Sequence, residues 1–305
     1  MSYSAYYARR CASYGSETSL EVGESIFQYG FIVKGIFAVL FASITAGLAG
    51  TYIVTRKMVF LSGGITHASF GGIGIGYYAG FSPVAGAAIF GILSALGIEY
   101  LSVSQKIRED SAIGILWAFG MAVGIIFIYL TPGYAPNLMG YLFGSLLTVT
   151  NAEIIALGIL SLALILYFII FYRTIIYISF DEEFARTYSH YVNIIKYLTT
   201  SLIALTIVLN IRMAGVVLVI SLLTIPPNIA MLFTRSYRRI ILWSVLAGFT
   251  GTAAGYAISY VAGIPVGATI IFTLVVLWML VKGLVLLHGR RNPAVREIKQ
   301  ATTNQ

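Results

Sequence analysis

The chain has 305 residues, of which 59% are hydrophobic and only 10% are charged, and its mean hydropathy is +0.90. An average soluble domain carries roughly 25% charged residues, so this composition excludes a soluble enzyme or binding module and indicates a membrane protein. Cys11 is the only cysteine, which excludes an internal disulfide and a metal site built from several thiolates.

Apolar runs of about 20 residues recur along almost the whole sequence, and each is long enough for roughly 30 Å of hydrocarbon. We therefore predict an all-α fold, a polytopic membrane helical bundle of about eight or nine transmembrane helices. They form one transmembrane domain over 29–288, between a polar N-terminal segment (1–28) and a C-terminal tail (289–305). The spans fall at about 30–54, 58–80, 83–104, 112–131, 152–172, 192–210, 213–233, 239–262 and 265–287.

The net charge of +8 is distributed unevenly between the two sides of the predicted membrane. With an odd number of crossings, nearly all of the 19 Lys and Arg residues share the side of the C-terminus, and the exceptions are Arg9, Arg10, Lys34 and Arg212. Cytoplasmic loops carry this excess, so the tail is predicted to be cytoplasmic and the N-terminus to lie outside or on the membrane surface. The pattern is that of a multi-pass protein of a bacterial-type inner (plasma) membrane, with no nucleic-acid partner.

The span over 58–80 combines a histidine with a line of small residues. Gly64, Ala68, Gly72 and Gly76 follow one another at intervals of four, a spacing that lets two membrane helices approach closely. His67 falls near the middle of the span, where an ionisable group is costly and is usually functional or paired. It could be a metal ligand, a proton carrier or a hydrogen-bond donor to a neighbouring helix.

Two segments interrupt the pattern of uniform helices. Pro226 and Pro227 lie inside the span over 213–233, and the carbonyl groups that they free need cover from protein or from a water-filled cavity. Asn228 beside them is a predicted polar lining residue. The segment 132–147 is too short after its prolines to cross the membrane and too apolar for a solvated loop, so we predict a re-entrant segment.

The segment 179–198 differs from the short basic turns of the cytoplasmic side. Ser179 and Asp181 are candidate helix caps, and acidic residues follow directly. We predict a short surface helix, which is either a solvated connector or a docking helix for a cytoplasmic partner. The sequence has no catalytic motif and no phosphate-binding loop, so the chain is not expected to be an enzyme, and any ATP must be hydrolysed by a separate chain.

Four stretches occur in the order that one family of transporters shows: TRKMVFLSGGITHASFGGIGIG (55–76), REDSAIGILWAFGMAVG (108–124), FDEEFARTYS (180–189) and IRMAGVVLVISLLTIPPNIA (211–230). With them the chain, over about residues 30–285, resembles the permease subunits of ATP-binding-cassette importers for zinc, manganese and iron, the ABC-3 family. The resemblance implies a second permease copy, a dimer of cytoplasmic ATP-binding subunits and an extracytoplasmic metal-binding protein. It also implies no permanently bound cofactor, with a divalent metal ion as the cargo.

The resemblance assigns 180–189 as the coupling helix that seats in the ATPase dimer, and its residues here are Asp181, Glu182, Glu183, Ala185 and Ser189. Ser189 replaces the glycine of the family pattern. Family members often carry an aspartate one turn before the histidine, and here that position is Gly63.

The interpretation that follows is a permease that passes zinc, manganese or iron, with His67 as a transient pathway ligand and the small residues beside it packing its helix. The missing aspartate slightly favours a second interpretation, in which the cargo is a metal chelate of the siderophore, haem or cobalamin type. A third is an ATP-independent transporter or an intramembrane enzyme, for which His67 is the only available deeply placed titratable group.

Overall fold

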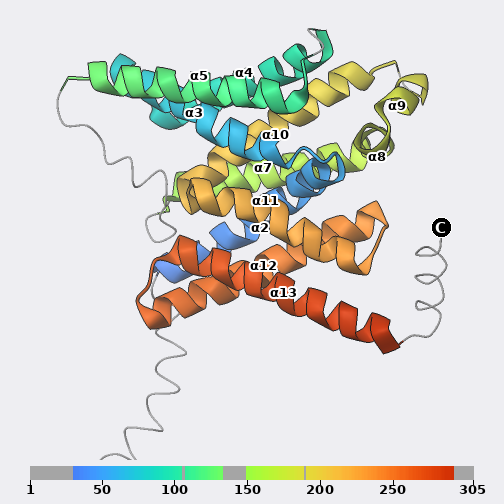
Figure 1. Ribbon diagram of the computed structural model, residues 1–305. Coiled ribbons are helices and arrows are strands. Elements are labelled where there is room, and N and C mark those ends of the chain that lie inside the picture. Colours follow the sequence, from blue (N-terminus) through green and yellow to red (C-terminus); the bar gives the residue numbers. More distant parts are fainter. Residues whose placement is uncertain (1–29, 105–106, 133–148, 189, 292–305) are drawn as a thin grey trace, which may run out of the picture.

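The computed structural model describes residues 30–104, 107–132, 149–188 and 190–291, and these residues form eleven helices without any strand (Figure 1). The helices are α2 (Gly30–Thr55), α3 (Val59–Ala79), α4 (Pro83–Ser104), α5 (Glu109–Leu130), α7 (Asn151–Ile170), α8 (Tyr172–Phe180), α9 (Glu182–Tyr188), α10 (Val192–Ala214), α11 (Val216–Phe233), α12 (Tyr237–Ala262) and α13 (Val266–Arg291). The prediction of an all-α bundle is confirmed.

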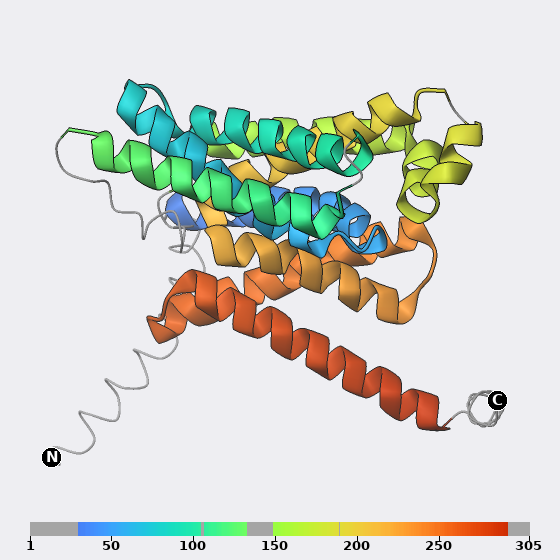
Figure 2. The same cartoon turned by 45° about the horizontal axis from the view of Figure 1, so that its top comes forward.

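Eight of these helices are long and apolar enough to cross a membrane, namely α2, α4, α5, α7 and α10 to α13. Helix α3 also has 21 residues, but glycine, serine, threonine and His67 dilute its apolar content. It packs closely against α4 and α5, so most of its surface contacts protein (Figures 1 and 2). The expected number of about eight or nine transmembrane helices is therefore correct.

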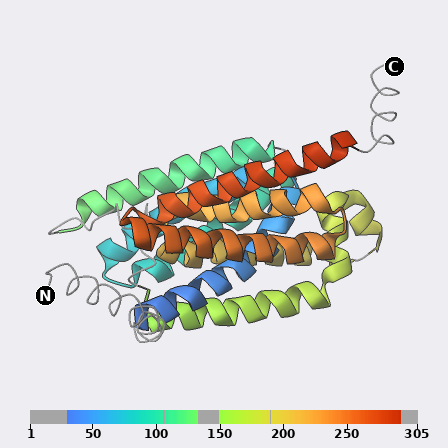
Figure 3. The same cartoon turned by 90° about the horizontal axis from the view of Figure 1, so that it is seen from below.

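The long helices run side by side, with α3, α4 and α5 grouped at one flank and α12 and α13 at the other (Figure 2). Helices α2 and α10 occupy the centre, where Tyr52, Ile53, Ile203 and Ile207 are fully buried. Helices α5 and α13 are the least buried of the spanning helices, and Figure 3 shows both along the same side of the molecule. Their exposed apolar side chains are what a lipid or protein neighbour in the membrane requires.

The connections divide into two ends. Helices α8 and α9, the α2–α3 turn, the α11–α12 turn and the end of α13 lie at one end, on the right of Figure 2. The α3–α4 and α12–α13 turns lie at the opposite end. The first end carries the loops with most of the Lys and Arg residues, so it corresponds to the predicted cytoplasmic side.

Three predicted segments fall largely outside the described residues. These are the polar N-terminus (1–28), the re-entrant segment (132–147) and the C-terminal tail (289–305). Helix α13 continues as far as Arg291, into the segment predicted as a tail. The three assignments stay predictions.

Helix α3 packs on α5 through residues that have little or no side chain. A Cβ atom built on Gly120 would lie 2.5 Å from Cα of Ala68, and one built on Gly74 would lie 2.5 Å from the carbonyl oxygen of Gly124. A Cβ on Gly64 would likewise overlap an α5 side chain. The two backbones therefore touch, as small residues permit in lipid, where the hydrophobic effect does not drive helices together.

The other side of α3 packs on α4 in the same way. A Cβ atom on Gly72 would overlap the carbonyl group of Gly86, and Gly76 approaches the first turn of α4. The structure thus divides the predicted line between two neighbours, because steps of four residues rotate by about 40° around a helix. Gly64 and Ala68 face α5, whereas Gly72 and Gly76 face α4.

These contacts predict that Gly72→Ala destabilises the permease domain, because the new methyl group forces α3 and α4 apart. The expected loss is about 1–3 kcal/mol, the usual cost of overpacking. Gly114→Ala is the matched control, since nothing lies within 4 Å of a Cβ at this α5 glycine. Thermal unfolding in detergent should show a lower melting temperature for the first variant only, and equal melting of both would contradict the contact.

Candidate functional site

His67 lies in α3 at the contact with α5. Its half-buried imidazole stacks on the indole of Trp117, with ring centroids 4.4 Å apart and planes 6° from parallel. Within the described part of the chain, no group forms a hydrogen bond with this imidazole. The stacking fixes the ring plane and leaves both ring nitrogens at the ring edge, where one lone pair can meet a ligand.

Gly63 precedes His67 by one turn of α3 and has room for a side chain. A Cβ atom there would lie 3.7 Å from Cζ3 of Trp117 and 3.8 Å from Cδ1 of Ile220 in α11, both ordinary van der Waals distances. This glycine therefore differs from those that bring α3 close to α4 and α5. The helix packing does not require glycine at this position.

Helix α11 carries Pro226 and Pro227, and both are buried. Proline lacks an N–H group, so Pro227 leaves the carbonyl of Leu223 without its usual helical donor. Gly50 of α2 covers this carbonyl, since a Cβ atom built on Gly50 would overlap it. The structure thus supplies protein cover for a carbonyl group freed by a proline, as expected at membrane depth.

Asn228 is exposed on α11, in contrast to the two prolines. Its Nδ2 donates to the carbonyl oxygen of Thr224 at 2.7 Å, and Ser221 lies one further turn back on the helix. The spacing places Ser221, Thr224 and Asn228 on one polar stripe of α11. The assignment of Asn228 and the prolines as pathway residues stays a prediction.

The predicted coupling segment forms α9 at the cytoplasmic end of the bundle. Asp181 is its N-cap, because the Asp181 Oδ1 accepts a hydrogen bond from the Phe184 N–H at 2.9 Å. Ser179 is not the cap: its buried hydroxyl donates to the carbonyl of Ile175 in α8. Helix α9 is short: Asp181 separates it from α8, and it ends at Tyr188, before α10 begins at Val192. Ser189 lies outside the described residues.

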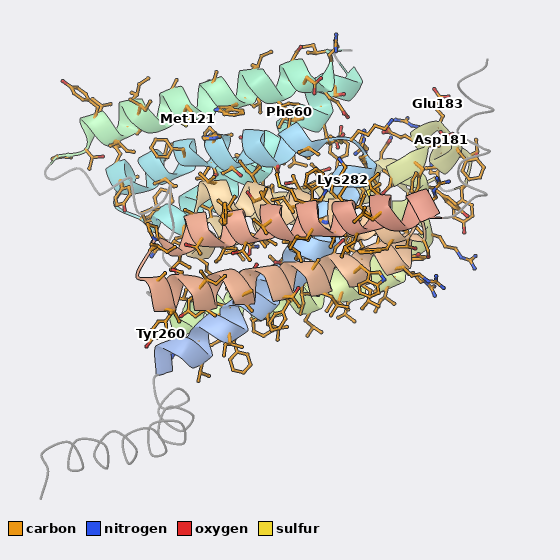
Figure 4. All side chains as sticks on the ribbon, turned by 60° about the horizontal axis from the view of Figure 1, so that its bottom comes forward. Phe60, Met121, Asp181, Glu183, Tyr260 and Lys282 are labelled. Atoms are coloured by element: carbon orange, nitrogen blue, oxygen red, sulfur yellow. The ribbon has the colours of Figure 1, made fainter. Side chains whose placement is uncertain are left out.

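The acidic residues of α9 face in two directions. Asp181 and Glu183 are exposed and lie at the surface of the cytoplasmic end (Figure 4), whereas Ala185 is completely buried within this chain. Glu182 points inward, with 25% of its side chain exposed. Exposed aromatic side chains flank the acids: Phe180, Phe184, Tyr188 and Tyr191. Aromatic residues are enriched at protein interfaces, so these exposed aromatic side chains favour a protein partner at this surface.

Glu182 belongs to a cluster of charged residues that the sequence alone did not predict. Arg56, in the turn between α2 and α3, lies 3.3 Å from Glu99 of α4, 3.4 Å from Glu182 and 3.6 Å from Glu109 of α5. Lys196 of α10 lies 2.8 Å from Glu99 and 2.9 Å from Glu182. We call these five residues the charge cluster.

The charge cluster is largely shielded from solvent. Only 1% of the Glu99 side chain and 4% of the Lys196 side chain are exposed. The Glu99 Oε1 accepts hydrogen bonds from Arg56 and Thr200. The Glu99 Oε2 forms an ion pair with the ammonium group of Lys196, without hydrogen-bond geometry. Removing one member would leave an uncompensated charge, which is the costly outcome for buried pairs.

The pKa of Glu182 reflects two opposing influences. Burial raises the pKa of this carboxyl group, but the hydrogen bonds and positive charges of Lys196, Arg186 and Arg56 outweigh burial and lower it overall. A nearby cation favours the ionised carboxylate. Glu182 is therefore negatively charged at neutral pH.

A family model described as the ABC 3 transport family matches residues 28–284 of this sequence. The chain belongs to this family. The predicted membership is confirmed, and with it a multi-pass protein of a bacterial-type inner membrane.

Relatives and solved structures agree with the ABC 3 assignment. An uncharacterized membrane protein of Synechocystis sp. is 38% identical over 84% of this chain and 91% of its own. The manganese transport system membrane protein MntC of Listeria innocua is 31% identical over the same shares. PsaBC from Streptococcus pneumoniae, solved in complex with Fab, matches with a TM-score of 0.76 and 27% identity, over 86% of this chain and 94% of that chain.

A second solved structure, an inward-facing ABC transporter of the metal-chelate type, has a TM-score of 0.65 and 16% identity, over 86% of this chain and 88% of that chain. At this identity the likeness concerns the fold alone. It does not distinguish a chelate from a bare ion as the cargo of this ABC 3 protein.

The lowered pKa of Glu182 gives a pH prediction. A carboxyl group whose folded pKa is depressed stabilises the fold above its unfolded pKa, and this stabilisation is lost as pH falls through the folded value. From about pH 6 to about pH 3, which spans ordinary carboxyl pKa values, wild-type melting temperature should therefore fall more steeply than that of Glu182→Gln. Parallel curves in detergent would contradict the ionic role of Glu182.

Proposed function

We propose that the chain is the membrane-spanning permease subunit of an ATP-binding-cassette importer for a divalent transition metal ion. It receives the ion from an extracytoplasmic binding protein and works with a second permease copy and a dimer of cytoplasmic ATPase subunits. The observation that carries the proposal is the placement of His67, an imidazole held by a stacked indole in the middle of a helix that otherwise carries small and apolar residues. The chain itself hydrolyses no ATP.

Manganese is the ion that the observations favour. A passing ion must be bound weakly enough to leave, and one imidazole with oxygen ligands meets this requirement better than a closed cage. Water and carbonyl oxygens suit manganese, an imidazole serves zinc and iron as well, and thiolates, which would favour softer metals, are limited to the single cysteine in the N-terminal segment. Relatives named as manganese transport proteins, at 31% and 32% identity, support the same choice.

The proposed pathway differs from the common family pattern at Gly63, where an aspartate is often found. Without the aspartate one turn before His67, the ion meets less negative charge at this depth, and its remaining ligands there would be water and backbone carbonyls. Because the space at Gly63 accepts a Cβ atom, the missing carboxylate can be restored by substitution. The chain therefore offers a direct test of its own pathway.

The overall test is ATP-driven uptake of radioactive manganese by the complete importer in proteoliposomes. Uptake that needs ATP and the binding protein supports the proposal. Uptake of a metal chelate without uptake of the free ion would show that the cargo is a chelate. Uptake that is independent of ATP would overturn the proposal.

His67→Ala should lower manganese uptake at least about tenfold, since even outer-shell partners of metal ligands cost 10–100-fold when lost. His67→Gln separates the roles, because a planar amide can still pack on the Trp117 indole as the imidazole does but is a poorer metal ligand than imidazole. Gly63→Asp should slow release of the ion, since residues 63 and 67 share one helical face. The measurements are uptake rate and metal retention. Wild-type uptake by His67→Gln, together with unchanged retention in Gly63→Asp, would assign His67 a structural role.

The docking role of α9 predicts that Glu183→Arg weakens binding of the ATPase subunits while the permease still inserts and folds. Charge reversal of an exposed residue disfavours the original partner, whereas a solvated connector would tolerate it. Co-purification and ATPase stimulation measure the effect. Ala185→Glu is not a suitable second variant for this test, because Ala185 is buried in this chain and the change would disturb folding. Normal ATPase stimulation by Glu183→Arg would contradict the docking role.

A further inference from the structure

The charge cluster connects two parts of the molecule: helices α3, α4 and α5, which position His67, and α9, the segment proposed to dock the ATPase. Glu182 extends from α9 and meets Arg56 and Lys196. Arg56 lies in the three-residue turn before α3, which carries His67, and it also faces Glu109 in the first turn of α5. From Glu109 to Trp117, the residue stacked on His67, is eight residues of helix, or about 12 Å.

The other end of this connection is a unit of three helices. Helices α3, α4 and α5 touch through the glycine contacts described above, where neither neighbour can shift without separating two backbones. Packed interfaces of this kind move as bodies instead of deforming continuously. A displacement applied at the cytoplasmic ends of α3, α4 and α5 therefore reaches the level of His67 and Trp117.

The turn that carries Arg56 is itself tightly constrained. Only three residues separate α2 from α3, and Lys57 among them has a φ angle of 61°, in the left-handed region that few residues other than glycine adopt. The amide of Met58 donates to the carbonyl oxygen of Ile53 at 2.9 Å, which closes the turn. Arg56 is thus held by its backbone as well as by its ion pairs, and it cannot absorb a movement of α9 by swinging away.

Among the acidic residues at α9, Glu182 is the one that contacts the cations of the charge cluster. One of its carboxylate oxygens meets both Arg56 and Lys196, while the other accepts a hydrogen bond from Arg186 within α9 at 2.9 Å. Glu182 is the one acidic residue of α9 that faces the cluster, since Glu183 and Asp181 face outward (Figure 4). It forms the ionic link from α9 to the helices of the pathway.

We propose that Glu182, through Arg56 and Lys196, transmits the movement of the docked α9 to the α3–α4–α5 unit and so couples ATP binding to the geometry at His67. Glu182 is a positioning residue, because it does not touch the transported ion. The inference rests on the proposed function in that it needs an ATPase at α9. It goes further by naming the internal connection between the two sites.

The main readout of the test is a response at Trp117, and manganese transport is a second readout. In a variant whose other two tryptophans, Trp243 and Trp278, are changed to phenylalanine, the permease is labelled with 5-fluorotryptophan and assembled with unlabelled ATPase subunits. Fluorine NMR then reports Trp117 alone. In the otherwise unchanged chain, ATP should shift this resonance.

Glu182→Gln should abolish the ATP-dependent shift while the ATPase still binds and hydrolyses ATP, and it should lower the manganese moved per ATP by about tenfold, within the range of couplings between sites. Glu182→Asp retains the charge and should restore most of the shift. Asp110→Asn is the matched control, because Asp110 is an exposed acid next to Glu109 and lies outside the cluster. It should behave like the parent chain.

Two results would overturn the link. The first is a normal Trp117 shift in Glu182→Gln, and the second is loss of ATPase binding and transport in parallel, which would make Glu182 part of the docking surface only. Failure of the proposed function gives a different result, in which the parent complex moves no manganese although Trp117 still responds to ATP.

Discussion

The close backbone contact of α3 with α4 and α5 is the constraint on which the other features of this permease depend. Lipid gives no hydrophobic drive for association, so helices in a membrane gain stability by approaching closely enough for van der Waals contact. Gly72 against Gly86 and Gly120 against Ala68 achieve this approach. Because α3 is enclosed in this way, it can carry glycines and the buried hydroxyl groups of Ser62, Thr66 and Ser69 without presenting them to lipid.

The enclosed helix also explains how function is distributed over the molecule. The outer surfaces of α5 and α13 remain apolar, as a membrane neighbour requires, and three groups of polar residues lie at the places proposed to carry function. These are the imidazole beside Trp117, the stripe of Ser221, Thr224 and Asn228 on α11, and the charge cluster at the cytoplasmic end. Ionisable groups at membrane depth are expensive, so it is physically reasonable that His67 and the charge cluster lie at the proposed pathway and the proposed connection.

Much of this architecture could be predicted from the sequence, because hydropathy and charge asymmetry act locally along the chain. Span lengths predicted the helices, intervals of four predicted close packing, and Asp181 was a correct candidate cap. The charge cluster could not be predicted in this way. Its members lie far apart in the sequence, where Glu99 is a single acidic residue near the cytoplasmic end of its predicted span. The division of the small-residue line between α4 and α5 likewise depends on tertiary packing, as does the burial of Ala185.

The central claim is that a bare divalent ion passes His67. Its most direct test is pulsed electron paramagnetic resonance of manganese retained in the assembled importer, with His190 and His288 replaced so that His67 is the only histidine of the permease. Isotopic labelling of the permease alone distinguishes its nitrogen from that of the partner subunits. The account predicts a histidine nitrogen coupling that disappears in His67→Gln. Manganese retained with oxygen couplings alone, and no nitrogen signal from the permease, would contradict it.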